Sequence, residues 1–260
     1  MVASKYIVGT SGFSFPDWVG PFYPPGTKAD GMFDIYIRHF DMVELNFTFY
    51  SMPGEATFRN LLDRSPKGFE FWVKVNRQIT HKRDLTVAEP FYGAARTIQD
   101  AGKLGGLVLQ FPQSFKRTEP NRRFLAAAFD AFPDMPLAVE FRDSSWDTPA
   151  TVEGLRNKSI SLIVPDAPPI AGLFHPPPVA TSRTGYLRLH SRDASKWYQG
   201  LAQRYDYSYS TAELQAIRRQ WSPIEPTVDR IYVMFNNCHR GQAAQDAAAF
   251  KSMLTDPAAN

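Results

Sequence analysis

The chain has 260 residues, of which 43% are hydrophobic and 21% are charged, a composition typical of a globular protein with a large core. Its one cysteine, Cys238, excludes an intramolecular disulfide, and the lack of an apolar signal core or a membrane-length apolar run favours a cytoplasmic protein without membrane contact. The net charge of +3 is compatible with an anionic ligand, nucleic acid included.

Short apolar runs typical of β-strands recur along the chain. They cover residues 6–9, 42–46, 71–76, 107–111, 137–142, 161–164, 186–190 and 231–236. Helical patterns separate most of them, at about 31–40, 54–64, 89–103, 119–131, 149–157, 211–221 and 242–254. The sixth connection, about 167–183, is rich in proline, which leaves open whether it holds a regular helix.

This alternation of strands and helices predicts a parallel sheet, and the chain length fits closure into a single (β/α)8 TIM barrel, one domain over residues 1–260. The alternative is a doubly wound open sheet. Strands buried between two helix layers are apolar on both faces, whereas most of these strands are apolar on one face only. The pattern therefore favours the barrel.

The second face of these strands carries polar and charged residues near the strand ends. They are Glu44, Asn46, Lys74, Asn76, Gln110, Glu140, Arg142, Arg188, His190 and Asn236. In parallel strands such residues converge on one end of the sheet. Buried charges are costly unless they are paired or used, so this convergence predicts a site.

Within this site, the expected roles follow from side-chain chemistry. Lys74, Arg142 and Arg188 are predicted to clamp an anion, and Lys74 could form a Schiff base if its pKa is depressed. Glu44 and Glu140 are candidates for acid/base catalysis or for a structural ion-pair network, and His190 for a proton shuttle or electrophile. Amide side chains are expected to orient the ligand; these are Asn46, Gln110, Asn236 and Asn237.

Loops add three further ligand-binding candidates. His81 lies in a basic loop, 77–83, and Trp18 lies in the aromatic loop after the first strand. Tyr198 belongs to a segment after the seventh strand in which aromatic residues alternate with Arg and Lys. This pattern suits stacking on bases or sugars beside an anion, and it also suits a loop packed over the barrel mouth, which is the favoured interpretation and leaves a lid role open.

Metal and cofactor signals are weak in this sequence. It contains no H-E-x-x-H motif, and a single cysteine excludes thiolate zinc sites. A divalent ion held by Glu44, Glu140, Asp166 and His190 is the less favoured interpretation, so no metal ligand is assigned and the cofactor is left unknown. The turn at 9–13 is not a P-loop and lacks the G-x-G-x-x-G spacing.

Several motifs together resemble a known family. They are Gly9-Thr10-Ser11-Gly12-Phe13, Val43-Glu44-Leu45-Asn46, Phe71-Trp72-Val73-Lys74, Leu109-Gln110-Phe111-Pro112, Val139-Glu140-Phe141-Arg142, Leu187-Arg188-Leu189-His190 and Phe235-Asn236-Asn237. In this order they are similar to the domain-of-unknown-function family 72, also called YecE-like. The resemblance implies a TIM barrel and supplies no reaction. Ser191 stands where the family pattern has Gly, and Asp246 where it has Asn.

The residues favour an enzyme or enzyme-like barrel, of hydrolase or lyase type, that binds a small phosphorylated or carboxylated ligand at the C-terminal strand ends. The basic segments 77–83 and 192–204 keep open a nucleic-acid-binding protein or an endonuclease-like phosphodiester enzyme. A non-catalytic metabolite sensor is the third alternative, because fold alone cannot choose among these functions.

Overall fold

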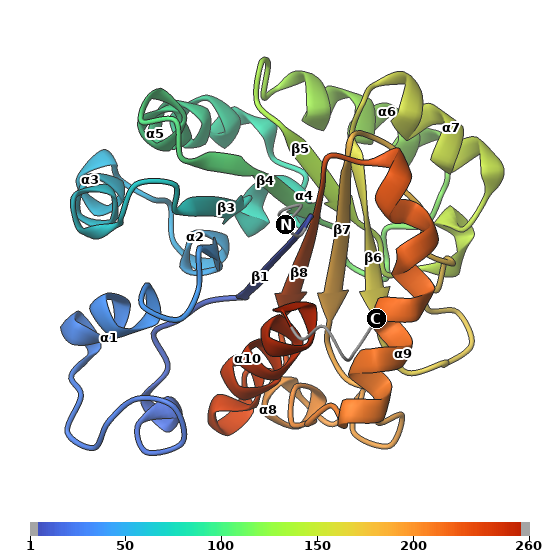
Figure 1. Ribbon diagram of the computed structural model, residues 1–260. Helices are drawn as coiled ribbons and strands as arrows, with labels where there is room; N and C mark the ends of the chain where they lie inside the picture. Colours follow the sequence, from blue (N-terminus) through green and yellow to red (C-terminus); the bar gives the residue numbers. More distant parts are fainter. Residues whose placement is uncertain (1–4, 256–260) are drawn as a thin grey trace.

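The structure is a computed structural model that describes residues 5–255, apart from the side chain of Leu201. Parallel strands alternate with helices, and the helices lie outside the strands (Figure 1). The strands are β1 (Tyr6–Thr10), β2 (Met42–Leu45), β3 (Glu70–Lys74), β4 (Leu104–Gln110), β5 (Leu137–Glu140), β6 (Ser161–Asp166), β7 (Thr184–Leu189) and β8 (Arg230–Phe235). The longer helices are α1 (Ala29–Tyr36), α3 (Glu55–Arg64), α5 (Ala88–Asp100), α6 (Glu119–Asp130), α7 (Pro149–Asn157), α9 (Thr211–Trp221) and α10 (Gln242–Thr255).

The predicted strands and longer helices are confirmed, with boundaries shifted by a few residues. Local capping explains some of these starts: Thr118 accepts a hydrogen bond from the backbone at the start of α6, and Ser210 and Glu213 form a capping box on α9. The described part of the chain adds three helices of a single turn that the periodicity did not predict, α2 (Phe47–Tyr50), α4 (Arg77–Thr80) and α8 (Leu201–Arg204). The proline-rich connection between β6 and β7 contains no helix. None of the helices within residues 5–255 combines the length and apolar character of a membrane span.

The strands form one nearly closed barrel. Their order is β1-β8-β7-β6-β5-β4-β3-β2, and every neighbouring pair is parallel. Between β1 and β2, the hydroxyl of Tyr36 accepts a hydrogen bond from Thr10 N at 3.0 Å and donates one to Met42 O at 2.9 Å. Beyond the strand ends, Gly12 N donates to Glu44 O at 2.8 Å. A tyrosine hydroxyl therefore takes the place of ladder bonds at this seam.

The two faces of the strands have different partners, as the sequence pattern predicts. The apolar face packs against the helices, and the other face fills the barrel. At the N-terminal side the interior is apolar, and its buried residues are Met42, Trp72, Val108, Ala138, Ile163, Tyr186, Tyr232 and Met234. The rings of Tyr186 and Tyr232 meet Trp72 edge-on, with centroids 4.7 and 5.1 Å away. The polar residues occupy the C-terminal half of the barrel interior, above the rings of Trp72, Tyr186 and Tyr232.

We expect Gly106→Ala to lower the free energy of unfolding by about 1–3 kcal/mol, because overpacking displaces neighbours in a filled core. A Cβ on Gly106 would lie 2.5 Å from the Trp72 ring and 2.7 Å from Pro136 O. Urea unfolding measures the change. The matched control is Gly154→Ala in α7, where a Cβ meets nothing within 4 Å and helix propensity predicts a gain of roughly 0.5–1 kcal/mol. Equal effects at the two sites would contradict the packing argument.

Candidate functional site at the barrel mouth

A cavity opens at the C-terminal ends of the strands, the end of a TIM barrel where active sites lie. It has two compartments, of about 510 and 330 Å³, and both are lined by Lys74, Tyr50 and Tyr205. The larger compartment is further lined by Phe49, Arg77, His81, Lys82, Gln110, Pro112, Gln113, Arg142, Leu173, Trp197 and Arg204. The smaller one is further lined by Ser11, Phe15, Asp17, Asn46, Ala202, Asn236, Cys238 and His239.

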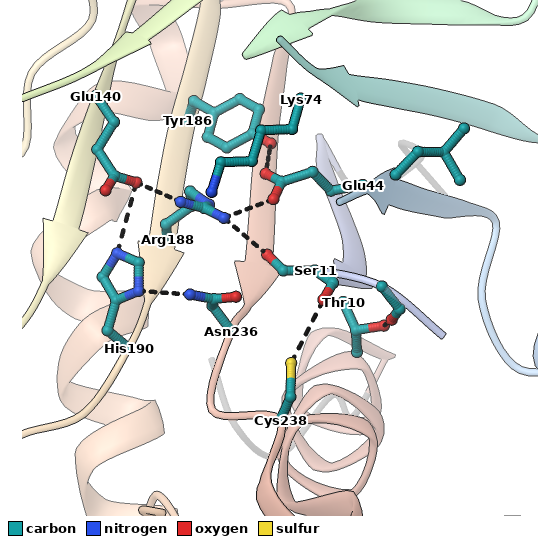
Figure 2. Close-up of polar contacts among 12 residues, drawn as sticks. Thr10, Ser11, Glu44, Lys74, Glu140, Tyr186, Arg188, His190, Asn236 and Cys238 are labelled. Carbon is teal, nitrogen blue, oxygen red and sulfur yellow. Dashed lines mark hydrogen bonds and ion pairs between the residues drawn. The ribbon is translucent and has the colours of Figure 1, made fainter. Parts of the chain in front are cut away.

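An ion-pair network centred on Arg188 lies buried in the upper barrel (Figure 2). Its Nη2 is 2.5 Å from Glu44 Oε1 and its Nη1 is 2.6 Å from Glu140 Oε2. Tyr186 donates a hydrogen bond of 2.8 Å to the other oxygen of Glu44. The three charged residues are 0% exposed, and none of them lines the cavity. The charges of this network are therefore paired with one another. This agrees with one of our two interpretations of Glu44 and Glu140 from the sequence, a structural ion-pair network.

Two further groups extend this network towards the cavity. Arg142, which lines the larger compartment, places Nε 2.6 Å from Glu140 Oε1, an ion pair without hydrogen-bond geometry. His190 Nε2 lies 3.5 Å from Glu140 Oε2, and Asn236 Nδ2 lies 2.9 Å from His190 Nδ1 (Figure 2). With Asn236 donating, the proton of neutral His190 resides on Nε2 and faces Glu140.

The charges around Glu140 fix its protonation state. Burial alone would raise the pKa of Glu140, but the guanidinium groups of Arg142 and Arg188 outweigh burial and hold that pKa well below its usual range. Burial, reinforced by Arg142 and opposed by Glu140, lowers the pKa of His190 to about 3. At neutral pH the pair is therefore carboxylate and neutral imidazole.

Lys74 differs from the buried arginines because its charge has no partner. It ends β3, is half-buried, and its Nζ forms no hydrogen bond or ion pair with any side chain in the described range. Its Nζ lies 4.4 Å from the centroid of the Phe49 ring. Figure 2 shows Lys74 reaching towards Arg188 and Glu44 with no interaction drawn to its amine. Burial, together with the charge of Arg188, lowers the pKa of Lys74 to about 7.

The segment after β7 covers one side of the mouth. Trp197 is buried, and its ring lies 5.7 Å from Arg142 Cζ and 5.0 Å from Arg204 Cζ. Arg204 Nε also donates to Trp197 O at 2.7 Å. The ring of Tyr205 lies 6.0 Å from that of His190. This segment is packed over the cavity, which is the arrangement that we expected from its mixture of aromatic and basic residues.

Some predicted site residues lie elsewhere. Trp18 is buried in the first loop and donates to Cys238 O, and Asn237 is buried and bonds Tyr207 O and Asp246. Tyr198 is exposed outside the cavity lining, although its hydroxyl is 3.5 Å from Gln113. Asp166 faces away from the barrel interior and binds Arg192 and Tyr209. The remaining lining candidates are Asn46, Gln110, His81 and Asn236.

No metal set forms at this site: Asp166 is separated from Glu44, Glu140 and His190, and residues 5–255 contain no group of three or more His, Cys, Asp or Glu side chains placed to hold an ion. Asp246, where the family resemblance led us to expect Asn, accepts hydrogen bonds from Tyr209 N at 2.9 Å and Asn237 Nδ2 at 2.7 Å. Ser208 Oγ donates a third hydrogen bond, of 3.2 Å, so the carboxylate of Asp246 accepts from three donors.

Several residues of the site were not predicted from the sequence. Tyr186 shares the strand parity of Arg188 and His190, so the alternation contained the signal for it. Tyr50 and Phe49 lie on the short helix α2, and Tyr205 follows α8. No strand or helix periodicity marks these positions, and only the folded chain brings them to the mouth.

The buried network predicts a loss of stability in acid. Unfolded histidine titrates near 6.5, so between pH 6.5 and about 3 the unfolded chain binds a proton that folded His190 does not. The stability is therefore fully present above pH 6.5 and falls as the pH drops, by at most about 1.4 kcal/mol per pH unit for this group. Glu140 adds a loss in the same direction below about pH 4.5.

Urea unfolding at a series of pH values measures this slope. We expect His190→Gln to unfold with a shallower dependence on pH between about 6.5 and 4, because glutamine has no proton to take up on unfolding. His81, whose pKa is lowered to about 4 by burial and by Lys74, retains part of the slope in this variant. An unchanged slope in His190→Gln would contradict the assignment of a neutral His190.

Comparisons with known proteins agree with this architecture. A family model described as "Protein of unknown function DUF72" matches residues 7–260. The UPF0759 protein YunF of Bacillus subtilis (strain 168) is 26% identical over 267 residues, which cover 95% of this chain and 94% of that protein. The crystal structure of a DUF72 family protein from Thermotoga maritima MSB8 is 36% identical, with a TM-score of 0.90, and covers 97% of this chain and 100% of its own.

A DUF72 family protein from Enterococcus faecalis V583 is more distant, with 23% identity, a TM-score of 0.85 and coverage of 96% of each chain. This likeness supports the fold alone. The names of these proteins state no substrate or reaction, so the chemistry has to be argued from the cavity.

Proposed function

Because this chain belongs to the DUF72 family, whose description assigns no function, we propose one from the cavity: the protein binds a small anionic ligand, phosphorylated or carboxylated, at the C-terminal ends of the strands. It acts on that ligand as a cytoplasmic enzyme of hydrolase or lyase type. The observation that carries this proposal is the imbalance of charge in the larger compartment.

Five cationic side chains line that compartment, and no aspartate or glutamate does, among the residues that the structure describes. They are Lys74, Arg77, Lys82, Arg142 and Arg204. Arg142 is paired with Glu140 below the lining, but the other four cations form no ion pair within residues 5–255, so an anion that enters relieves their mutual repulsion and gains charge-assisted hydrogen bonds. The volume of about 510 Å³ suits a small molecule.

The roles within the site differ from one cation to the next. Arg188 is held by two carboxylates below the lining, so it positions the network, and its own charge is offset there. Arg142 reaches the compartment directly, and Asn46 and Asn236 present amides to the neighbouring compartment. Acid/base roles for Glu44, Glu140 and His190 stay predictions, since all three are enclosed and Glu140 holds its charge.

Calorimetric titration with glycerol 3-phosphate, malonate and uncharged glycerol tests the proposal. We expect binding of at least one anion and none of glycerol. The double variant Arg77→Met/Lys82→Met removes two exposed cations and is expected to weaken anion binding about tenfold to a hundredfold, whereas Arg59→Met on the outer surface of α3 is the matched control. Absence of binding by both anions at low salt would contradict the proposal.

A second candidate, nucleic-acid binding, is favoured by one observation. Tyr50 at the rim and Tyr198 beside Gln113 are each 59% exposed next to this cationic cavity, and exposed aromatic rings beside cations suit stacking on bases. If nucleic acid is the ligand, a fluorescent single-stranded oligonucleotide binds with a steep salt dependence, and Tyr50→Ala weakens it. No binding at low salt would remove this candidate.

A further inference from the structure

We propose that Lys74 is a nucleophile that forms an imine with the carbonyl carbon of an anionic aldehyde or ketone, the anion lying in the cationic compartment and the rest of the ligand in the amide-lined one. This inference rests on the proposed function and deepens it, because it names the class of substrate. Three features of the site support it: the position of Lys74, its lack of a partner, and the chemistry of the two compartments.

The position of Lys74 is the first feature. Its side chain lines both compartments, so one ligand that spans them would place a central carbon beside Nζ. It ends β3, a rigid strand paired on both sides with β2 and β4. A nucleophile on a strand end is held in place more precisely than one on a loop.

The second feature is that the amine of Lys74 forms no ion pair with a described residue. Within the described chain, Arg188 forms ion pairs with both Glu44 and Glu140, whereas Lys74 Nζ forms an ion pair with neither. Burial and the charges of Arg188 and Arg142 disfavour the ammonium form of Lys74 more than Glu44, Glu140 and the ring of Phe49 favour it. The lowered pKa, about 7, leaves a large share of the amine unprotonated near neutral pH, as nucleophilic attack requires.

The third feature is the difference between the compartments. The one with Arg77, Lys82 and Arg142 suits a phosphate or carboxylate group. The other offers Ser11, Asn46 and Asn236, groups that hydrogen-bond hydroxyls, and Oδ1 of Asn46 is buried there without a partner within residues 5–255. A short polyhydroxy carbonyl compound with one anionic end matches both compartments.

The step balances without a co-reactant. Nζ forms a bond to the carbonyl carbon, the carbonyl oxygen leaves as water with the two amine protons, and a carbon–nitrogen double bond remains. Water protonates the imine nitrogen, and the iminium carbon then draws electrons from a bond of the neighbouring carbon. A broken carbon–hydrogen bond releases its proton to water, and a broken bond to a hydroxyl-bearing carbon releases that carbon as an aldehyde whose hydroxyl proton passes to water. That chemistry agrees with the lyase branch of the proposed function.

Borohydride trapping with glyceraldehyde 3-phosphate tests the inference in the full-length protein. We expect a mass increase of one ligand less one oxygen atom, mapped by peptide sequencing to Lys74. Unphosphorylated glyceraldehyde should trap at least about tenfold less. The trapping rate should rise with an inflection near pH 7, the pKa of Lys74, well below that of an ordinary lysine.

Variants separate the alternatives. Lys74→Arg keeps the charge and cannot form an imine, so it should lose the adduct and still bind glycerol 3-phosphate, whereas Lys158→Arg, outside the cavity beside Asp130, should trap as the parent does. If a variant fails to fold, the position of the adduct in the parent protein still tests the inference. Anion binding without a Lys74 adduct overturns the imine and leaves the proposed function standing; absence of both overturns both. An adduct spread over surface lysines also overturns it.

Discussion

Replacement of Arg188 by methionine is expected to lower the free energy of unfolding by about 3–5 kcal/mol, the cost measured when one partner of a buried ion pair is removed. The guanidinium of Arg188 is 2.5 Å from Glu44 and 2.6 Å from Glu140, and both carboxylates are 0% exposed. Without Arg188, two negative charges would be left in the barrel interior. The two carboxylates would have to become protonated, or water would have to enter the barrel, or the C-terminal end of the barrel would have to unfold locally.

Neutralising the carboxylates should recover most of this loss. We expect Arg188→Met/Glu44→Gln/Glu140→Gln to be clearly more stable than Arg188→Met, because the triple variant removes both buried carboxylates and leaves only Arg142, which lines the cavity, without its partner. The matched control is Arg123→Met on α6, whose ion pair with Glu119 is exposed, and its effect should stay within about 0.5 kcal/mol. Urea unfolding of all three variants is the measurement. Wild-type stability in Arg188→Met would contradict the network.

The barrel itself could be predicted from the sequence, because few folds accommodate parallel strands that are apolar on one face only. The strand at 137–142 is apolar at Leu137, Val139 and Phe141 and carries Glu140 and Arg142 on its other face, so it needs helices on one side only. The end at which polar residues gather also followed from parallel strands. The proline-rich sixth connection likewise proved to lack a helix, since proline removes backbone donors.

The division of labour among the polar residues could not be predicted. Alternation places Lys74, Arg142 and Arg188 on the same face, but it does not say which cation the carboxylates take. That choice depends on depth along the strand and on neighbours across the barrel, such as Glu44 and Arg188, which lie far apart in sequence. Enclosure of Arg188 and accessibility of Lys74 are therefore properties of the closed barrel.

Loop residues were the least predictable part of the site. Asn237 follows Asn236 directly, yet it points to Asp246 and Tyr207 outside the barrel, because successive residues after a strand diverge. Tyr50 lies on the single-turn helix α2 and Tyr205 directly follows the single-turn helix α8, and neither sequence is long enough to show a helical period. Contacts among these loops decide which aromatic ring lines the cavity, and no local sequence pattern indicates it.

Lys74→Met is expected to raise the free energy of unfolding in acid and at neutral pH while it weakens anion binding. Folding lowers the pKa of Lys74 from 10.5 to about 7, so the charged amine destabilises the folded state. The full shift corresponds to about 5 kcal/mol, and because the side chain is half-exposed and screened we expect a gain of roughly 1–3 kcal/mol. A residue that destabilises the folded state and forms no ion pair is a good candidate for a functional role.

The pH dependence follows from the same shift. Below about pH 7 both states carry the proton, so the whole cost of the charged amine is present and the variant has its largest advantage. Between about pH 7 and 10.5 only the unfolded chain keeps the proton, and the advantage shrinks as the pH rises. Above that range both states are neutral and the difference reduces to packing.

Ligand reverses the order of stability if the cationic compartment binds an anion. At a glycerol 3-phosphate concentration about 100 times the dissociation constant, the parent protein should gain about 2.7 kcal/mol, and Lys74→Met, with weaker binding, should gain less. Urea unfolding with and without ligand at about pH 6 measures both effects, with exposed Lys158→Met as the control expected to change stability by less than about 0.5 kcal/mol. A destabilised Lys74→Met that binds the anion as the parent does would make Lys74 a structural residue, because its amine would then stabilise the fold and leave the ligand unaffected.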